Sequence, residues 1–308
     1  AAAAGLLPSA VADAAASLTP LPPEPLRPGD VVGGETDWAV QHPYEPGRAE
    51  TRLHRVPELR AISADGEWLA LGAAVTIAEV KDSDLIAAAW PALPEFLTLF
   101  ASPGIRASAT LGGNLANASP AADVSVVLLA LGAEVEIAGP GGGAAGELPS
   151  TTRRLPLEDF FLSYKRTALD PGDVITTVRI PRNADGTRRL HAIKVSKRPH
   201  DDITSMTSAV VAQVDDDAAP PRLGDVRLAA GGVAPVPRLL RETASALEGA
   251  PVDAETVRAA AATARAEATP IDDLRGSAAY KRALLGNQVI AHLDALIPGT
   301  VDWQEALA

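Results

Sequence analysis

Two segments of the sequence carry paired glycines followed by short polar side chains, a composition suited to binding phosphate. The first is VVGGETD, residues 31–37, and the second is TLGGNLANASPAAD, residues 110–123. Glycine lets backbone N–H groups approach an anion because no Cβ stands in the way. The hydroxyl and amide groups of Thr36, Thr110 and Asn114 add hydrogen-bond donors. Two such loops could hold a pyrophosphate between them.

Neither segment has the spacing of the common nucleotide-binding motifs. The sequence is not GxxxxGK[ST], which argues against a P-loop, and it is not GxGxxG, which argues against the dinucleotide-binding fold of that signature. A single Gly-Gly pair is more often a turn that closes a strand. From the residues alone, phosphate-binding loops and strand-closing turns are therefore both open interpretations.

Composition narrows the chemistry that the chain can perform. The chain has 308 residues, a net charge of −12 and no cysteine. Disulfides, thiol nucleophiles, iron–sulfur clusters and Cys-ligated zinc are thereby excluded within it. The five histidines lie far apart without HExxH spacing, so we predict no metal site. The acidic charge argues against nucleic acid as a partner, and no apolar run is long enough to span a membrane.

The hydrophobic pattern predicts a mixed α+β chain that is long enough for two domains. Proline-interrupted helix is expected over 84–100, and a short helix after Ser9. A flexible surface hairpin or loop is expected over 139–152. Further helix is expected from Thr76, over 124–132, as a turn over 157–164, and as three helices over 238–297. Strands are expected at 31–32, 68–75, 133–139 and 172–181, and an antiparallel meander at 190–198, 203–214 and 224–233.

Several blocks of the sequence resemble one family of flavoproteins. GIRASATLGGNLANASPAADVSVVLLALGAEVEI resembles the flavin loop of the xanthine dehydrogenase family, the molybdenum hydroxylases, and GGETDWAV resembles its first flavin loop. PLEDFFLSYKRTALDPGDVITTVRIP and KVSKRPHDDITSMTSAV resemble the following segment and the flavin-facing loop of the C-terminal part. RLAAGGVAPVPRLLRETASALEG and PIDDLRGSAAYKRALLGN resemble its helical end. The resemblance covers nearly the whole chain in the same order.

The resemblance implies a fold and a domain division. It implies an α+β chain in which a two-subdomain FAD-binding domain of the vanillyl-alcohol-oxidase/PCMH type precedes a C-terminal domain. That second domain consists of a small antiparallel sheet and three helices. The boundary falls near PRNADGT, so we expect an FAD-binding domain over 1–183, with its two subdomains meeting near residue 55, and a C-terminal domain over 184–308.

The resemblance also implies which residues contact FAD. The first loop should surround its phosphates and ribose, the second should bind its pyrophosphate through backbone N–H groups, and other positions should lie near its adenosine part or ring system. These residues are Val32, Gly33, Gly34, Glu35, Thr36, Asp37, Phe100, Thr110, Leu111, Gly112, Gly113, Asn114, Asp123, Ile175 and Lys194.

Four residues are expected near the flavin ring and its electron acceptor: Tyr164, Lys194, Asp201 and Asp202. None of them needs to act as an acid or base. Each position also has an ordinary explanation. Tyr164 could be a half-buried ring beside its neighbouring phenylalanines, Lys194 a solvated lysine, and the aspartates a turn between strands. Asp123 could also be the N-cap of the helix that follows it.

The resemblance leads to three functional hypotheses. In the first, the chain is the FAD-binding electron-transfer subunit of a cytoplasmic, heterotrimeric xanthine dehydrogenase-like enzyme. It takes electrons from 2Fe-2S clusters on an iron–sulfur subunit or domain, beside a molybdopterin-binding large subunit, and passes hydride from FAD to NAD. In the second, it is the flavin subunit of an aldehyde- or CO-dehydrogenase-type relative that reduces quinone or oxygen. In the third, it is a binding or assembly protein that has lost its flavin, which the intact glycine loops disfavour.

Overall fold

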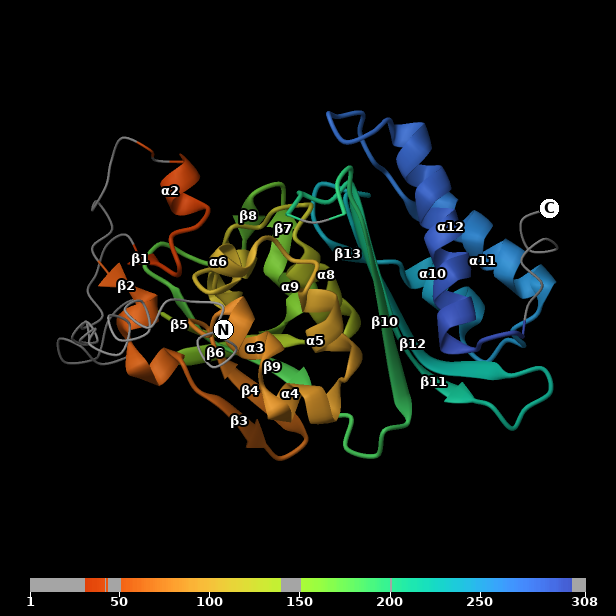
Figure 1. The fold of residues 1–308 in the computed structure, drawn as a ribbon, viewed down its shortest axis with the longest axis horizontal. Coiled ribbons are helices and arrows are strands. Elements are labelled where there is room, and N and C mark those ends of the chain that lie inside the picture. Colours follow the sequence, from red (N-terminus) through yellow and green to blue (C-terminus); the bar gives the residue numbers. More distant parts are fainter. Residues whose placement is uncertain (1–30, 42, 44–50, 140–150, 200, 301–308) are drawn as a thin grey trace, which may run out of the picture.

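The computed structural model describes residues 31–41, 43, 51–139, 151–199 and 201–300. Most of the loop expected over 139–152 and the helix expected after Ser9 lie outside these residues. Figure 1 shows a mixed α/β body and a three-helix layer with the long strands of one sheet standing between them. The helices are α2 Trp38–Gln41, α3 Ile77–Lys81, α4 Asp84–Ala89, α5 Ala92–Leu97, α6 Pro103–Arg106, α7 Leu111–Ala116, α8 Asp123–Ala130, α9 Leu157–Phe160, α10 Arg241–Leu247, α11 Ala254–Glu267 and α12 Ala278–Leu296, with 3-10 turns at Leu53–Arg55 and Pro57–Leu59.

The strands of the first half form a five-stranded antiparallel sheet in the order β3-β4-β9-β5-β6. Strand β9, which the alternating pattern predicted, lies in its centre and is buried along almost its whole length, including the polar residues Thr176 and Arg179. Short pairs β1-β2 and β7-β8 lie outside this sheet. The strands are β1 Val31–Val32, β2 Thr51–Arg52, β3 Ile62–Asp65, β4 Trp68–Gly72, β5 Glu134–Ala138, β6 Thr152–Pro156, β7 Phe161–Ser163, β8 Arg166–Thr167 and β9 Val174–Pro181.

The expected meander is confirmed by the second sheet, in which β10-β11-β12-β13 pair antiparallel in sequence order. These strands are β10 Arg188–Val195, β11 Met206–Asp215, β12 Arg222–Gly231 and β13 Arg238–Leu239. Along β11, Ala209 and Val211 join the core of the first half, whereas Val210 and Ala212 join the core under α10, α11 and α12. Both faces of the strand are therefore buried, and the expected three terminal helices cover one of them (Figure 1).

Two expected elements differ from the structure. The segment that opens at Thr110 is not all loop, because residues Leu111–Ala116 form helix α7. The hydroxyl of Thr110 accepts the N–H of Gly113 at 3.1 Å, and the helix buries Leu111 and Leu115. Capping and burial together offset the helix-breaking tendency of the glycine pair. The helical turn expected over 157–164 ends at Phe160, and β7 begins at Phe161.

A chain of hydrogen bonds joins α12 to the second sheet. Ser208 donates its only hydroxyl proton to Gln288 Oε1 at 2.9 Å, so its oxygen accepts from Nε2 of the buried His292 at 2.7 Å. His292 Nδ1 must then accept from His191 Nδ1, which lies 2.9 Å away. The network thus assigns one neutral tautomer to each ring. Burial lowers the pKa of His292 well below its usual value, and the neighbouring His191 lowers it further.

Protonation of His292 should therefore destabilise the fold at acidic pH. A histidine whose pKa is depressed in the folded state binds its proton more readily when unfolded, so stability is complete above about pH 6.5 and declines below it. We expect the free energy of unfolding to fall by up to about 1.4 kcal/mol per pH unit from this residue. Urea denaturation at pH 7.5, 6.5 and 5.5 measures the slope. His292→Gln should reduce the dependence of the free energy of unfolding on pH. Ser208→Ala keeps both imidazoles and should leave that dependence unchanged. If His292→Gln showed the same dependence as the wild type, His292 would not be its source.

Candidate flavin-binding site

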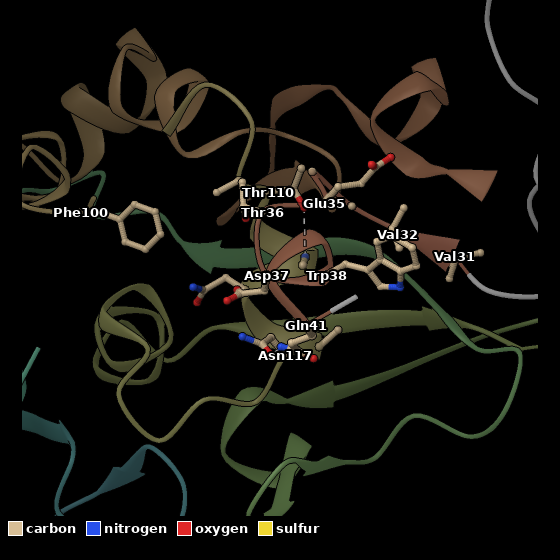
Figure 2. A pocket seen from close by; sticks show the side chains of 16 residues that line it. Val31, Val32, Glu35, Thr36, Asp37, Trp38, Gln41, Phe100, Thr110 and Asn117 are labelled. Carbon is tan, nitrogen blue, oxygen red and sulfur yellow. Dashed lines mark hydrogen bonds between the residues drawn. The ribbon is translucent and has the colours of Figure 1, made fainter. Parts of the chain in front are cut away.

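A hollow of about 200 Å³ lies where the two glycine loops meet. Figure 2 shows the side chains of the first loop, with Gln41 and Asn117, gathered on one part of its wall, while Phe100 stands on another. Most of the residues that the sequence nominated for FAD line it. These are Val32, Gly33, Gly34, Glu35, Thr36, Asp37, Phe100, Thr110, Gly113 and Asn114.

The glycines allow the two loops to touch. A Cβ on Gly33 would lie 2.2 Å from Thr110 Oγ1, and a Cβ on Gly34 would lie 1.6 Å from the backbone oxygen of Ser108. Because a side chain cannot occupy either position, only glycine permits this approach. The loops, which are far apart in sequence, thus form one continuous wall. This contact supports the expectation that the two loops act as a pair.

Two polar side chains tie the first loop to the segment that follows it. Arg52 forms an ion pair with Glu35, and His54 Nδ1 lies 3.0 Å from the carbonyl oxygen of Gly33. Glu35 has a left-handed backbone, with φ of 60°, which is uncommon for a residue with a side chain. The ion pair holds this residue in its turn, so the carboxylate of Glu35 has a role in shaping the loop.

The backbone N–H groups of the second loop already have acceptors within the protein. Leu111 N–H donates to Val75 O at 3.0 Å and Gly112 N–H to Ala73 O at 2.8 Å. Gly113 and Asn114 donate to the side-chain and backbone oxygens of Thr110. In this arrangement the second loop offers a ligand space and side-chain groups, rather than the row of free N–H donors that the sequence suggested.

Phe100 is held at the rim of the hollow by its neighbours. The guanidinium Nη1 of Arg106 donates to the carbonyl oxygens of Thr98, Phe100 and Ala101, at 3.1, 2.5 and 2.7 Å. Lys194 Nζ donates to the carbonyl of Leu99 at 2.9 Å. The ring thus sits on a segment whose carbonyl groups are fixed by two cations, and a flat ligand would meet a surface that is already in place.

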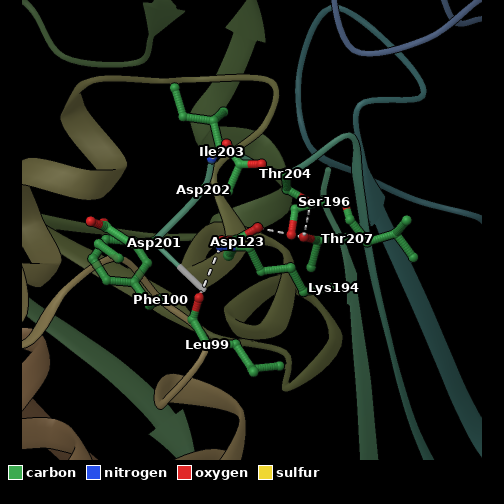
Figure 3. A network of polar contacts seen from close by, with 12 residues as sticks. Leu99, Phe100, Asp123, Lys194, Ser196, Asp201, Asp202, Ile203, Thr204 and Thr207 are labelled. Carbon is green, nitrogen blue, oxygen red and sulfur yellow. Dashed lines mark hydrogen bonds and ion pairs between the residues drawn. The ribbon is translucent and has the colours of Figure 1, made fainter. Parts of the chain in front are cut away.

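Asp123 and Lys194 form a buried ion pair behind this segment. Lys194 Nζ lies 2.9 Å from Asp123 Oδ2, and the other carboxylate oxygen accepts from the hydroxyl of Thr207 (Figure 3). Burial raises the pKa of Asp123, and the charge of Lys194 opposes that shift. Asp123 is not the N-cap of α8: that position is Ala122, which has no capping side chain. Lys194 is a buried, paired lysine rather than a solvated one.

The remaining nominated residues lie outside the hollow. Leu111 and Ile175 are buried in the core of the first half, and Gly112 packs on Ala73. Tyr164 is 61% exposed in the β7-β8 hairpin, so it is not a half-buried ring beside Phe160 and Phe161. Asp201 and Asp202 lie on the loop between β10 and β11, together with Thr204, whose hydroxyl is 3.0 Å from that of Thr207 (Figure 3).

The Asp202 carboxylate is engaged within its own loop. It accepts hydrogen bonds from two backbone N–H groups, that of Arg198 at 2.9 Å and that of the adjacent Ile203 at 3.0 Å. These bonds, led by the one from Arg198, hold the pKa of Asp202 below its usual value. Asp201 adopts a left-handed backbone with φ of 49°. The loop is therefore a defined turn with its two carboxylates set at its tip.

The hollow also includes residues that sequence reasoning did not assign to FAD. Gln41 Nε2 donates to Asn117 Oδ1 at 3.4 Å, and Lys165 Nζ donates to the same oxygen at 2.6 Å. Asn117 falls within the polar run after the second glycine pair, which was the available signal. The additional lining residues are Val31, Trp38, Gln41, Ala109, Ala116 and Asn117.

Other kinds of site find little support in the part of the chain that the structure describes. Within it, no three His, Cys, Asp or Glu side chains come together in a way that could hold a metal ion. No helix among these residues is both long enough and apolar enough to cross a membrane.

Comparison with known proteins assigns the chain to one class. Residues 6–183 match the family described as the FAD binding domain in molybdopterin dehydrogenase, and residues 191–294 match the CO dehydrogenase flavoprotein C-terminal domain. This class is that of the FAD-binding flavoproteins. The chain belongs to the molybdenum hydroxylase family, as a flavin component of its oxidoreductases. The expected FAD-binding α+β fold with a C-terminal sheet-and-helix domain is confirmed.

Two of the relatives are carbon monoxide dehydrogenase medium chains. That of Hydrogenophaga pseudoflava is 32% identical over 79% of each chain, and that of Afipia carboxidovorans is 30% identical over 91% of each chain. A solved carbon monoxide dehydrogenase from Hydrogenophaga pseudoflava superimposes with a TM-score of 0.76 at 26% identity, covering 89% of this chain and 96% of that one. These relatives favour the second functional hypothesis over the xanthine dehydrogenase-like one.

Proposed function

We propose that this chain is the FAD-binding electron-transfer subunit of a CO-dehydrogenase-type molybdenum hydroxylase. The observation that carries the proposal is the contact between the two glycine loops, which forms a hollow with Phe100 at its rim. A protein that had lost its flavin would have no need to keep the positions of Gly33 and Gly34 free of side chains. The family match supplies the ligand class.

The residues of the hollow fit the parts of FAD. Thr36 and Asn114 line the hollow with hydroxyl and amide groups that would bind phosphate oxygens. Asp37 adds a carboxylate that would accept from a ribose hydroxyl, and Phe100 offers an apolar face for a ring. Bound FAD would supply the chemistry of accepting electrons singly and releasing them in pairs. The protein's part is to bind and orient it. The Asp123–Lys194 pair holds the carbonyl segment beside Phe100 while adding no net charge.

We propose quinone or oxygen, rather than NAD, as the electron acceptor. The medium chains of carbon monoxide dehydrogenases support this, since they match over most of the chain. Tyr164, which the first hypothesis places near a nicotinamide, is not among the residues that line the hollow.

The electron donors must lie elsewhere, because a chain without cysteine cannot ligate iron–sulfur clusters. We propose an iron–sulfur partner that carries 2Fe-2S clusters and a molybdopterin-binding large subunit, together forming a heterotrimer in the cytoplasm. We further propose that the chain divides after residue 183, with a subdomain boundary near 55. The positions at which the two family matches end and begin support that division.

An anaerobic titration of the FAD-loaded chain tests both parts of this proposal. NADH is added first and visible absorption is followed. The photoreduced protein is then mixed with NAD, with a water-soluble benzoquinone and with oxygenated buffer in separate experiments. We expect NADH to leave the flavin spectrum unchanged, and quinone or oxygen to restore the oxidised spectrum much faster than NAD does.

The possible results distinguish a wrong electron acceptor from a wrong FAD-binding site. Rapid bleaching by NADH would overturn the proposed acceptor and restore the first hypothesis, while leaving the FAD site intact. A chain that holds no flavin, even after incubation with FAD, would overturn the site itself. In that case the two glycine pairs would be strand-closing turns.

A further inference from the structure

A buried lysine outside the flavin site begins a chain of contacts that leads back to it. Lys281 lies in the first turn of α12, and its side chain is only 2% exposed. Its ammonium lies 2.7 Å from Asp273 Oδ2 and donates to the carbonyl of Ile271 at 3.0 Å. Lysine is almost never fully buried unless its charge is paired. The ion pair fixes the turn formed by residues 271–276, which precedes the helix.

The turn 271–276 is not held by burial of its own side chains. Leu274 is 91% exposed. Its shape instead comes from Asp273, whose Oδ1 accepts the N–H groups of Arg275 at 2.8 Å and Gly276 at 3.2 Å. The same carboxylate binds Lys281 through its other oxygen, so the lysine ties this turn to α12.

The turn 271–276 also holds both ends of the loop that carries Asp201 and Asp202. Lys197 Nζ donates to the carbonyl of Leu274 at 2.7 Å, and Ser205 Oγ donates to the carbonyl of Arg275 at 3.2 Å. Lys197 and Ser205, near the two ends of this loop, are thereby bonded to the turn. Within the protein, the same loop is held by Thr204, whose hydroxyl lies 3.0 Å from that of Thr207. The Thr207 hydroxyl also contacts the carboxylate of Asp123 (Figure 3).

We propose that Lys281 is a positioning residue for electron transfer: acting through Asp273 and the turn 271–276, it fixes the loop 196–205 and its two carboxylates beside the flavin ring. The inference rests on the proposed function and on the place of this loop. The loop begins two residues after Lys194, whose ammonium donates to the carbonyl of Leu99, next to Phe100 on the wall of the hollow. Carboxylates held near the ring disfavour the anionic reduced form, so their position influences the flavin's reduction potential. Lys281 touches neither FAD nor an acceptor, and it acts only through this chain of contacts.

The test compares Lys281→Met with the wild-type FAD-loaded chain and with Arg282→Met. Arg282 is the matched control because it lies next on α12 and reaches the carbonyl of Ala268 instead of the turn. Hydrogen exchange over 196–205 and over α11 is measured together with the flavin's reduction potential. In Lys281→Met we expect exchange over 196–205 to rise about tenfold while α11 stays protected. We also expect the reduction potential to move to a more positive value, and Arg282→Met to change neither.

Two further variants keep the test decisive. Asp273→Asn removes the charge with little change of shape and should reproduce both effects if Lys281→Met fails to fold, whereas Lys281→Arg should largely restore the wild-type values. Unchanged exchange over 196–205 in both Lys281→Met and Asp273→Asn would overturn the inference. Faster exchange with an unchanged reduction potential would also overturn it, by showing that the loop does not act on the flavin. If the wild type binds no FAD, the proposed function fails, which is a separate result.

Discussion

Replacing Gly34 with alanine is expected to give a folded protein that purifies without FAD. The new Cβ would lie 1.6 Å from the backbone oxygen of Ser108 and 2.5 Å from its carbonyl carbon, so the first loop must move away from the segment that leads into the second loop. No rotamer change can relieve a contact with backbone. We expect the affinity for FAD to fall at least about 100-fold, or about 2.7 kcal/mol, because the wall of the hollow is opened at its centre.

Gly104→Ala is the matched control for this change. Gly104 lies in helix α6, and a Cβ added there would meet nothing within 4 Å. We expect this variant to bind FAD normally and to gain slightly in stability, since alanine is the better helix former by about 1 kcal/mol. Quenching of flavin fluorescence during titration of the FAD-free proteins gives both dissociation constants. If Gly34→Ala bound FAD as tightly as Gly104→Ala does, the loop contact would not form the site.

The sequence predicted the elements whose signals are local. The meander follows from alternating apolar residues in three consecutive segments, and Thr76 with Glu79 forms the capping box that starts α3. Helix α7 was missed because the two glycines argue against a helix more strongly than the local cap at Thr110 argues for one, and the burial of Leu111 that stabilises the helix is a tertiary contact. The place of β9 between β4 and β5 was also beyond reach, since each pairing joins distant segments.

The same division applies to the site. The two glycine pairs were visible as composition, and the resemblance nominated Asp123 and Lys194 as residues near FAD. Their pairing with each other was not expected, because nothing in the local sequence relates positions so far apart. Asn117 and Gln41 likewise meet only in the folded chain, from segments separated by 76 positions. Which residues share a wall is decided by packing, and a single sequence without aligned relatives does not report packing.

The Asp123–Lys194 pair leads to the second large effect, a loss of stability in Lys194→Met. Methionine fills a similar volume but leaves the Asp123 carboxylate buried without its cation. Breaking a buried ion pair from one side typically costs about 3–5 kcal/mol, because the remaining charge has lost both water and partner. We expect a loss of this size at pH 7 in urea denaturation of the FAD-free protein, where ligand binding does not contribute.

The loss of stability in Lys194→Met, relative to the wild type, should become smaller as the pH is lowered, and this direction of change identifies its cause. Burial already raises the pKa of Asp123 in the wild type, and removal of Lys194 removes the charge that opposes that shift. A carboxyl whose pKa is higher in the folded state than in the unfolded state binds a proton on folding, so the variant regains stability as the pH falls from 7 to 5. Arg241→Met is the control: Arg241 pairs with Glu158 at 2.8 Å but is 70% exposed, so its loss should cost less than about 1 kcal/mol at either pH. A deficit in Lys194→Met that stayed constant or grew at pH 5 would mean that lost packing, rather than an unpaired carboxylate, destabilises the variant.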